Sequence, residues 1–71
     1  MTVAQKVGRN IALARKHAGL SQAGLAERLP SMASQEVSRM ERGVNCPRLT
    51  TLLPVARAIG VPLTDLLEGI E

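Results

Sequence analysis

Apolar residues recur three and four positions apart along most of this 71-residue chain, which is the spacing of helices that bury one face. The first inward stripe consists of Val3, Val7, Ile11, Ala14 and Ala18. No segment shows the strict alternation of a half-buried strand, so the sequence predicts an all-α fold. The pattern predicts five helices, over residues 2–18, 22–29, 33–42, 49–59 and 63–68.

Capping residues mark the ends of the first two predicted helices. Thr2 and Ser21 are suitable N-caps, because their hydroxyls can accept a hydrogen bond from a free amide of the first turn. Gly19 suits the position after the first helix, where a left-handed backbone is common. Pro30 ends the second helix, because its ring disfavours helical geometry at the preceding residue.

Pro54 conflicts with a continuous fourth helix. Inside a helix a proline removes a hydrogen bond and clashes with the preceding turn, at a cost of about 3 kcal/mol. The conflict disappears if Thr51 is the N-cap, because Pro54 would then have no amide partner to lose. The sequence therefore predicts a late start or a kink. The inward residues of this helix are Leu49, Leu52, Val55, Ala56 and Ile59.

Residues 34–43 divide at helical spacing into two different faces. Val37 and Met40 lie three apart and can pack inward. The opposite face carries Gln and Arg, the side chains that bind adenine and guanine edges through two hydrogen bonds, beside a short serine. Taken alone, a segment of this kind is more often an ordinary amphipathic helix, here one that ends at Gly43. The residues of its outward face are Gln35, Ser38, Arg39 and Arg42.

Charge is distributed unevenly along the chain. The net charge is +3, but residues 1–48 carry +5 and residues 49–71 carry −2. A basic part followed by an acidic part is typical of a domain that meets a polyanion on one side. Ordinary charge scatter is the alternative interpretation of these numbers.

Composition excludes several classes of protein. The chain has no aromatic residue, so aliphatic side chains must build the core of a single small domain over residues 1–71. No apolar run approaches membrane-spanning length, and no signal-peptide pattern is present, so we expect a cytoplasmic protein. Cys46 has no partner for an internal disulfide, and with His17 it makes no metal site. We expect no enzyme activity, cofactor or metal, since no catalytic arrangement is visible.

The order of these elements resembles the phage-repressor helix-turn-helix family, of the Cro/cI or xenobiotic-response-element type. The resemblance covers nearly the whole chain. It implies a compact five-helix, lambda-repressor-like DNA-binding domain whose third helix, about residues 33–42, enters the major groove of double-stranded DNA. The residues that carry the resemblance are Arg15, Gly19-Leu20-Ser21-Gln22, Leu25-Ala26, Val37 to Gly43, Pro47, Leu52, Ala56 and Gly60-Val61.

The resemblance and the residue chemistry together assign candidate roles. The base-reading candidates are Ser34, Gln35, Ser38 and Arg39. The phosphate-binding candidates are Gln22, Arg42, Asn45 and Arg48, although Asn45 could equally stabilise the turn. Arg15 and Glu41 match a family pair that forms a structural ion pair. The candidate dimer surface, which could instead be simple packing against the fourth helix, consists of Leu63, Leu66, Leu67 and Ile70.

One segment departs from the family pattern. The turn of residues 30–32 is one residue longer than usual, and Pro30 replaces the customary glycine. The register of residues 33–36 is therefore open, and so is the choice between Ser34 and Gln35 as the first base reader. Ser31 or Ser34 could cap the third helix. Glu36 could favour the helix dipole or accept a hydrogen bond from a cytosine amino group.

We expect a sequence-specific DNA-binding transcriptional regulator that acts as a homodimer on a two-fold-related operator. In such a dimer the two recognition helices enter successive major grooves about 34 Å apart. Two alternatives remain open at this point. One is the antitoxin of a toxin–antitoxin pair, with a toxin as protein partner, and the other is the controller protein of a restriction–modification system.

Overall fold

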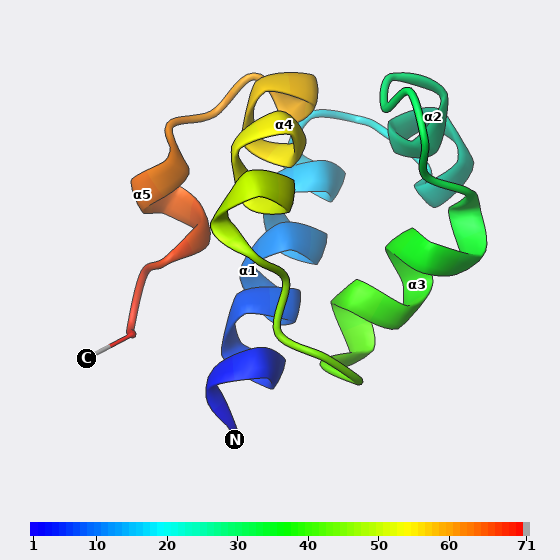
Figure 1. Cartoon of the computed structure of the whole chain (residues 1–71). Coiled ribbons are helices and arrows are strands. Elements are labelled where there is room, and N and C mark those ends of the chain that lie inside the picture. The colour runs from blue at the N-terminus through cyan, green and yellow to red at the C-terminus, as the bar shows by residue number, and fades with distance from the viewer. Residues whose placement is uncertain (71) are drawn as a thin grey trace.

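Helix α1 (Val3–His17) is the longest element of the computed structural model, which describes residues 1–70 (Figure 1). Thr2 is its N-cap, as predicted: the Thr2 hydroxyl accepts a hydrogen bond from the Gln5 amide at 3.1 Å, and the Gln5 side chain accepts one from the Thr2 amide at 2.8 Å. This reciprocal capping box satisfies two amides that the helix leaves free. After the helix, Gly19 adopts a φ of +75°.

Helices α2 (Gln22–Glu27) and α3 (Ser34–Arg42) follow. Ser21 caps α2 as predicted, since its hydroxyl accepts a hydrogen bond from the Gly24 amide at 2.8 Å. The predicted end at residue 29 is wrong, because Arg28 and Leu29 close the segment with tighter hydrogen bonds to residues three positions earlier. Helix α3 begins at residue 34 with Ala33 as its N-cap, so neither Ser31 nor Ser34 caps it.

Helix α4 (Leu49–Ile59) has the predicted bounds, but its predicted late start is wrong. The amides of Thr51 and Leu52 both donate to the Arg48 carbonyl at 2.9 Å, so Arg48 is the N-cap and Pro54 lies inside the helix. A kink at Pro54 stays a prediction. Helix α5 (Leu63–Leu66) is two residues shorter than predicted, because a turn ends it.

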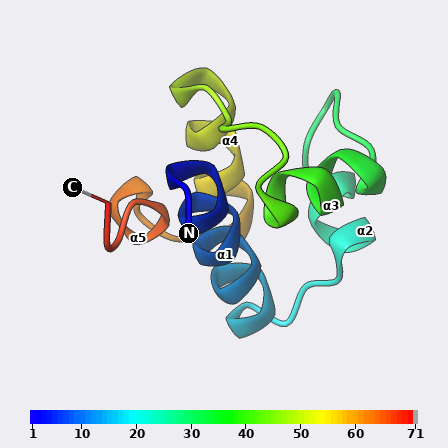
Figure 2. The same ribbon diagram turned by 90° about the horizontal axis from the view of Figure 1, so that it is seen from below.

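Helix α1 lies at the centre of the fold. Figures 1 and 2 show α3 on one side of it and α5 on the opposite side. Three predicted core positions are exposed: Val3 and Leu49, at 50% and 56%, and Ala18. All three lie at helix ends: Val3 and Leu49 are the first residues of their helices, and Ala18 is the C-cap of α1. The buried apolar core consists of Val7, Ile11, Leu25, Ala26, Leu29, Val37, Met40, Leu52, Val55, Ala56, Ile59 and Leu66.

Two glycines allow α1 and α3 to approach closely. A Cβ on Gly8 would clash with the Met40 carbonyl and lie 2.7 Å from the Glu41 carbonyl. A Cβ on Gly43 would lie 2.6 Å from Cα of Gln5. Because both clashes involve backbone atoms, a side chain at either position would push α3 away from α1.

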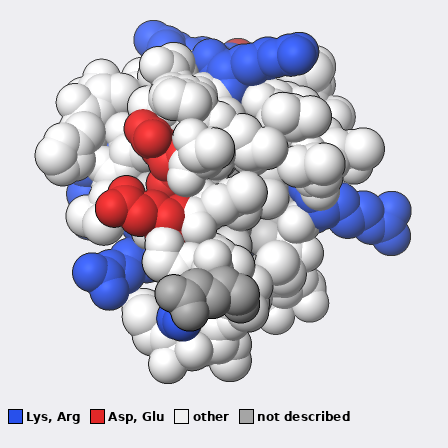
Figure 3. All heavy atoms as spheres, turned by 90° about the vertical axis from the view of Figure 1, so that its left-hand side faces the viewer, with Lys and Arg blue, Asp and Glu red and all other residues white. Residues whose placement is uncertain are grey.

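The face that α5 covers carries a group of acidic side chains. Figure 3 shows them gathered to the left of the middle of this face, with basic side chains toward its edges. Asp65 and Glu68 line a hollow there, between α5 and α1. This face lies on the side of α1 away from α3 (Figure 2). Among residues 1–70, no helix is both long and apolar enough to span a membrane.

Candidate nucleic-acid interface

The outward face of α3 brings four of the predicted site residues together. Gln35, Ser38, Arg39 and Arg42 line one shallow hollow with Glu36. Gln35, Arg39 and Arg42 are exposed, and Ser38 is half-buried. Their side chains make no hydrogen bond or ion pair to any other part of residues 1–70. This face therefore presents amide and guanidinium groups that are available to an outside partner.

The start of α3 decides which residues share that face. Because the helix begins at residue 34, Gln35 lies one turn before Arg39 on the outward face. Ser34 is exposed but lies outside the hollow. Gln35, and not Ser34, is thus grouped with Arg39. Glu36 lies in the first turn, where its carboxylate is favourable to the helix dipole, and it accepts a long 3.5 Å hydrogen bond from the Ala33 amide.

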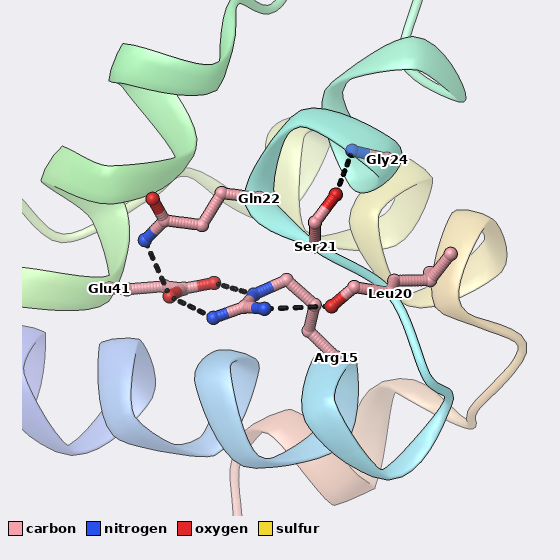
Figure 4. A network of polar contacts seen from close by, with 6 residues as sticks. All are labelled: Arg15, Leu20, Ser21, Gln22, Gly24 and Glu41. Atoms are coloured by element: carbon pink, nitrogen blue, oxygen red, sulfur yellow. Dashed lines mark hydrogen bonds and ion pairs between the residues drawn. The ribbon is translucent and has the colours of Figure 1, made fainter.

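The inward face of α3 is held by a buried ion pair. Nε of Arg15 donates to Oε2 of Glu41 at 2.6 Å, and Nη2 of Arg15 donates to Oε1 at 3.0 Å (Figure 4). Nη1 of Arg15 donates to the Leu20 carbonyl at 2.8 Å. The hydrogen bonding of the Arg15 guanidinium to the Glu41 carboxylate raises the pKa of Arg15, burial lowers it, and the attraction between the two charges raises it further. The pair fixes the rotation of α3 about its axis.

Gln22 joins this network from the first residue of α2. Its Nε2 donates to Oε1 of Glu41 at 3.1 Å, so side chains from α1, α2 and α3 meet at one carboxylate (Figure 4). The predicted phosphate contact of Gln22 would have to use the second amide hydrogen. Gln22 therefore also links α2 to α3, a role that the sequence did not indicate.

The remaining phosphate candidates surround the end of α3. Arg42 occupies its last position, Asn45 lies in the connector, and Arg48 is the N-cap of α4. All three are exposed. Asn45 makes no side-chain hydrogen bond within residues 1–70 that would stabilise the turn.

The predicted dimer surface needs a correction. Leu66 is fully buried, with 0% exposure, and is part of the core. Leu63, Leu67 and Ile70 are only partly buried. The pattern of α5 did not separate Leu66 from these neighbours, because a four-residue helix is too short for a clear period.

Leu49, which was predicted to face inward, is exposed on α4 next to Leu53, and neither Leu53 nor Asn10 was predicted to have a role. Leu49 and Leu53 are 56% and 38% exposed and lie one turn apart on α4. Asn10 of α1 donates through Nδ2 to the carbonyls of Leu66 and Glu68, at 3.0 and 2.8 Å. It thus holds the end of α5, a long-range contact for which the sequence contains no local signal.

A family model described as helix-turn-helix matches residues 11–66 of the chain. The matched range contains all of α2, α3 and α4, the pair of Arg15 with Glu41, and the whole outward face of α3. No curated protein matches the chain.

Proposed function

The chain belongs to the helix-turn-helix family of DNA-binding regulatory domains, and we propose that it reads specific DNA sequences with the outward face of α3. One observation carries this proposal. The inward face of α3 is buried and tied to α1 and α2, while the outward face keeps Gln35, Ser38, Arg39 and Arg42 without partners among residues 1–70. A helix that is already held in place can enter the major groove with little further loss of conformational freedom.

The side chains on this face suit base recognition. Arg39 can donate two hydrogen bonds to O6 and N7 of guanine, and Gln35 can pair in the same way with N6 and N7 of adenine. Ser38 is short, so it allows the helix to approach the bases closely. Arg42, Asn45 and Arg48 lie at the end of α3 and would position the domain through phosphate contacts.

Dimerisation would give this small domain a longer operator. Two recognition helices about 34 Å apart fit successive major grooves, and one domain of this size buries little DNA surface by itself. Leu49 and Leu53 are exposed on α4, which follows α3 after a short connector. Together with partly buried side chains of α5, they form our candidate dimer surface, which consists of Leu49, Leu53, Leu63, Leu67 and Ile70.

Selection from a pool of random double-stranded DNA tests the proposal. We expect enrichment of one sequence with two-fold symmetry and half-sites about one helical turn apart. Enrichment of a single asymmetric site would support base reading and contradict the dimer. A pool that remains random after selection would contradict sequence-specific binding itself.

A further inference from the structure

A second hollow lies beside the outward face of α3, on the side that turns toward α4. Its volume is about 260 Å³, ample for a methyl group. Two of its residues, Glu36 and Arg39, also belong to the outward face. A molecule that covers the outward face of α3 would therefore also cover the mouth of this hollow. Its lining residues are Met32, Glu36, Arg39, Met40, Asn45, Pro47 and Thr51.

The lining suits an apolar group better than a phosphate. Met32, Met40 and Pro47 supply apolar surface, and methionine side chains adapt to groups of different shape. The Glu36 carboxylate lies on one wall, and a negative charge there would repel a phosphate. Because the hollow adjoins the base-reading residues, the group that fits it is the edge of a base with an apolar substituent.

We propose that this hollow receives the C5-methyl group of a pyrimidine in the major groove. The inference rests on the proposed function, since it requires α3 to lie in that groove. The methyl belongs to a base pair next to the one that Arg39 reads, because Arg39 forms part of the wall. Met32 is the residue that determines this preference, since it is partly exposed while Met40 is 7% exposed.

Thymine and 5-methylcytosine carry the same methyl group at the same place in the groove. The polar residues of the wall can serve either base. The Thr51 hydroxyl can donate a hydrogen bond to O4 of thymine, and the Glu36 carboxylate can accept one from N4 of 5-methylcytosine. The shared chemistry is the methyl group, and DNA synthesis allows the two sources to be tested separately.

The test uses operator DNA in which single methyl groups are removed. After selection of the operator, the base pair at which Arg39→Ala loses its sequence preference is identified. The base pairs on either side of it are the positions tested. Deoxyuridine replaces thymidine there, and in a second pair of duplexes cytosine is compared with 5-methylcytosine. We expect each methyl group to strengthen binding by about fourfold, the effect of burying one such group. Equal binding within both pairs of duplexes would overturn the proposal.

Protein variants assign the effect to the hollow. Met32→Ala should reduce the ratio of affinities for the thymidine and deoxyuridine duplexes to about one, whereas Met32→Leu should preserve most of it. Leu13→Ala, an exposed leucine of α1, is the matched control and should keep the full ratio. Because each variant is compared with itself on two duplexes, a general loss of stability does not affect the ratio. A full ratio in Met32→Ala would overturn the assignment to this hollow.

The two levels of the proposal fail in different ways. A wild-type protein that shows no preference among DNA sequences contradicts the proposed function, and this inference with it. A wild-type protein that selects an operator but ignores every C5-methyl group beside the Arg39 position contradicts only this inference.

Discussion

At the scale of single residues, the carboxylate of Glu41 links the rest of the domain to α3. It accepts hydrogen bonds from Arg15 of α1 and from Gln22 of α2. The side chains of Arg15 and Glu41 are 9% and 7% exposed. Burial of two charges is costly. The two hydrogen bonds between Arg15 and Glu41, and the hydrogen bond that Arg15 donates to the Leu20 carbonyl, offset that cost. The pair therefore contributes mainly to the orientation of α3.

Removal of one partner should reveal this arrangement. Glu41→Ala leaves the buried guanidinium of Arg15 without its counter-charge, so we expect the free energy of unfolding to fall by about 3–5 kcal/mol. Urea denaturation followed by circular dichroism measures the change. Glu27→Ala is the matched control, because Glu27 is exposed in α2 and should change stability by less than about 0.5 kcal/mol. Equal effects of the two substitutions would contradict a structural role for the pair.

At the scale of elements, the short helices depend on their neighbours. Helices α2 and α5 have six and four residues, far below the length at which an isolated helix is stable. Packing of Leu25 and Leu66 into the core holds them in place, and Asn10 adds two hydrogen bonds to the end of α5. Helix α3 gains its position from the glycine contacts with α1.

Local chemistry predicted much of this element structure. The helical period gave all five helices, and the capping residues Thr2 and Ser21 are confirmed. The wrong predictions of burial have a common physical cause, which is contact between distant parts of the chain. The hydrophobic period cannot tell that Leu66 is buried while Leu49 is exposed, because only the neighbouring elements decide this. For the same reason, no local signal indicates the close approach of α1 and α3 at Gly8.

Pro54 gives a prediction at the same scale. It is the sixth residue of α4. At this position any other residue would donate its backbone amide to the carbonyl of Thr50. Pro54→Ala restores this hydrogen bond and removes the ring clash, so we expect the free energy of unfolding to rise by up to about 3 kcal/mol. Thermal denaturation measures the change. A lower melting temperature would contradict the view that the proline strains the helix.

At the scale of the whole molecule, the two sides of α1 differ in chemistry. The side with α3 carries the outward face of polar and basic residues, whereas the side with α5 carries the carboxylates of Asp65 and Glu68 (Figure 3). DNA would be repelled by the second side and attracted to the first. The exposed leucines of α4 belong to neither group, and this leaves them available for a second copy of the chain.

The dimer surface can be tested without disturbing the core. The double substitution Leu49→Glu and Leu53→Glu places charges on exposed positions, so the domain should stay folded but sediment as a monomer. It should also bind the two-fold operator more weakly than the wild-type dimer does. Leu13→Glu, at another exposed leucine, is the control and should remain dimeric. A dimer that survives the double substitution would place the interface elsewhere.

The central claim is that the outward face of α3 reads bases, and one comparison tests it most directly. The affinities of wild type, Arg39→Ala and the exposed control Arg57→Ala are measured on the selected operator and on every single-base variant of one half-site. We predict that Arg39→Ala loses about 1–3 kcal/mol of binding and its preference at one position per half-site, while Arg57→Ala keeps the full pattern. An equal loss for Arg39→Ala on every sequence would contradict base reading by this helix.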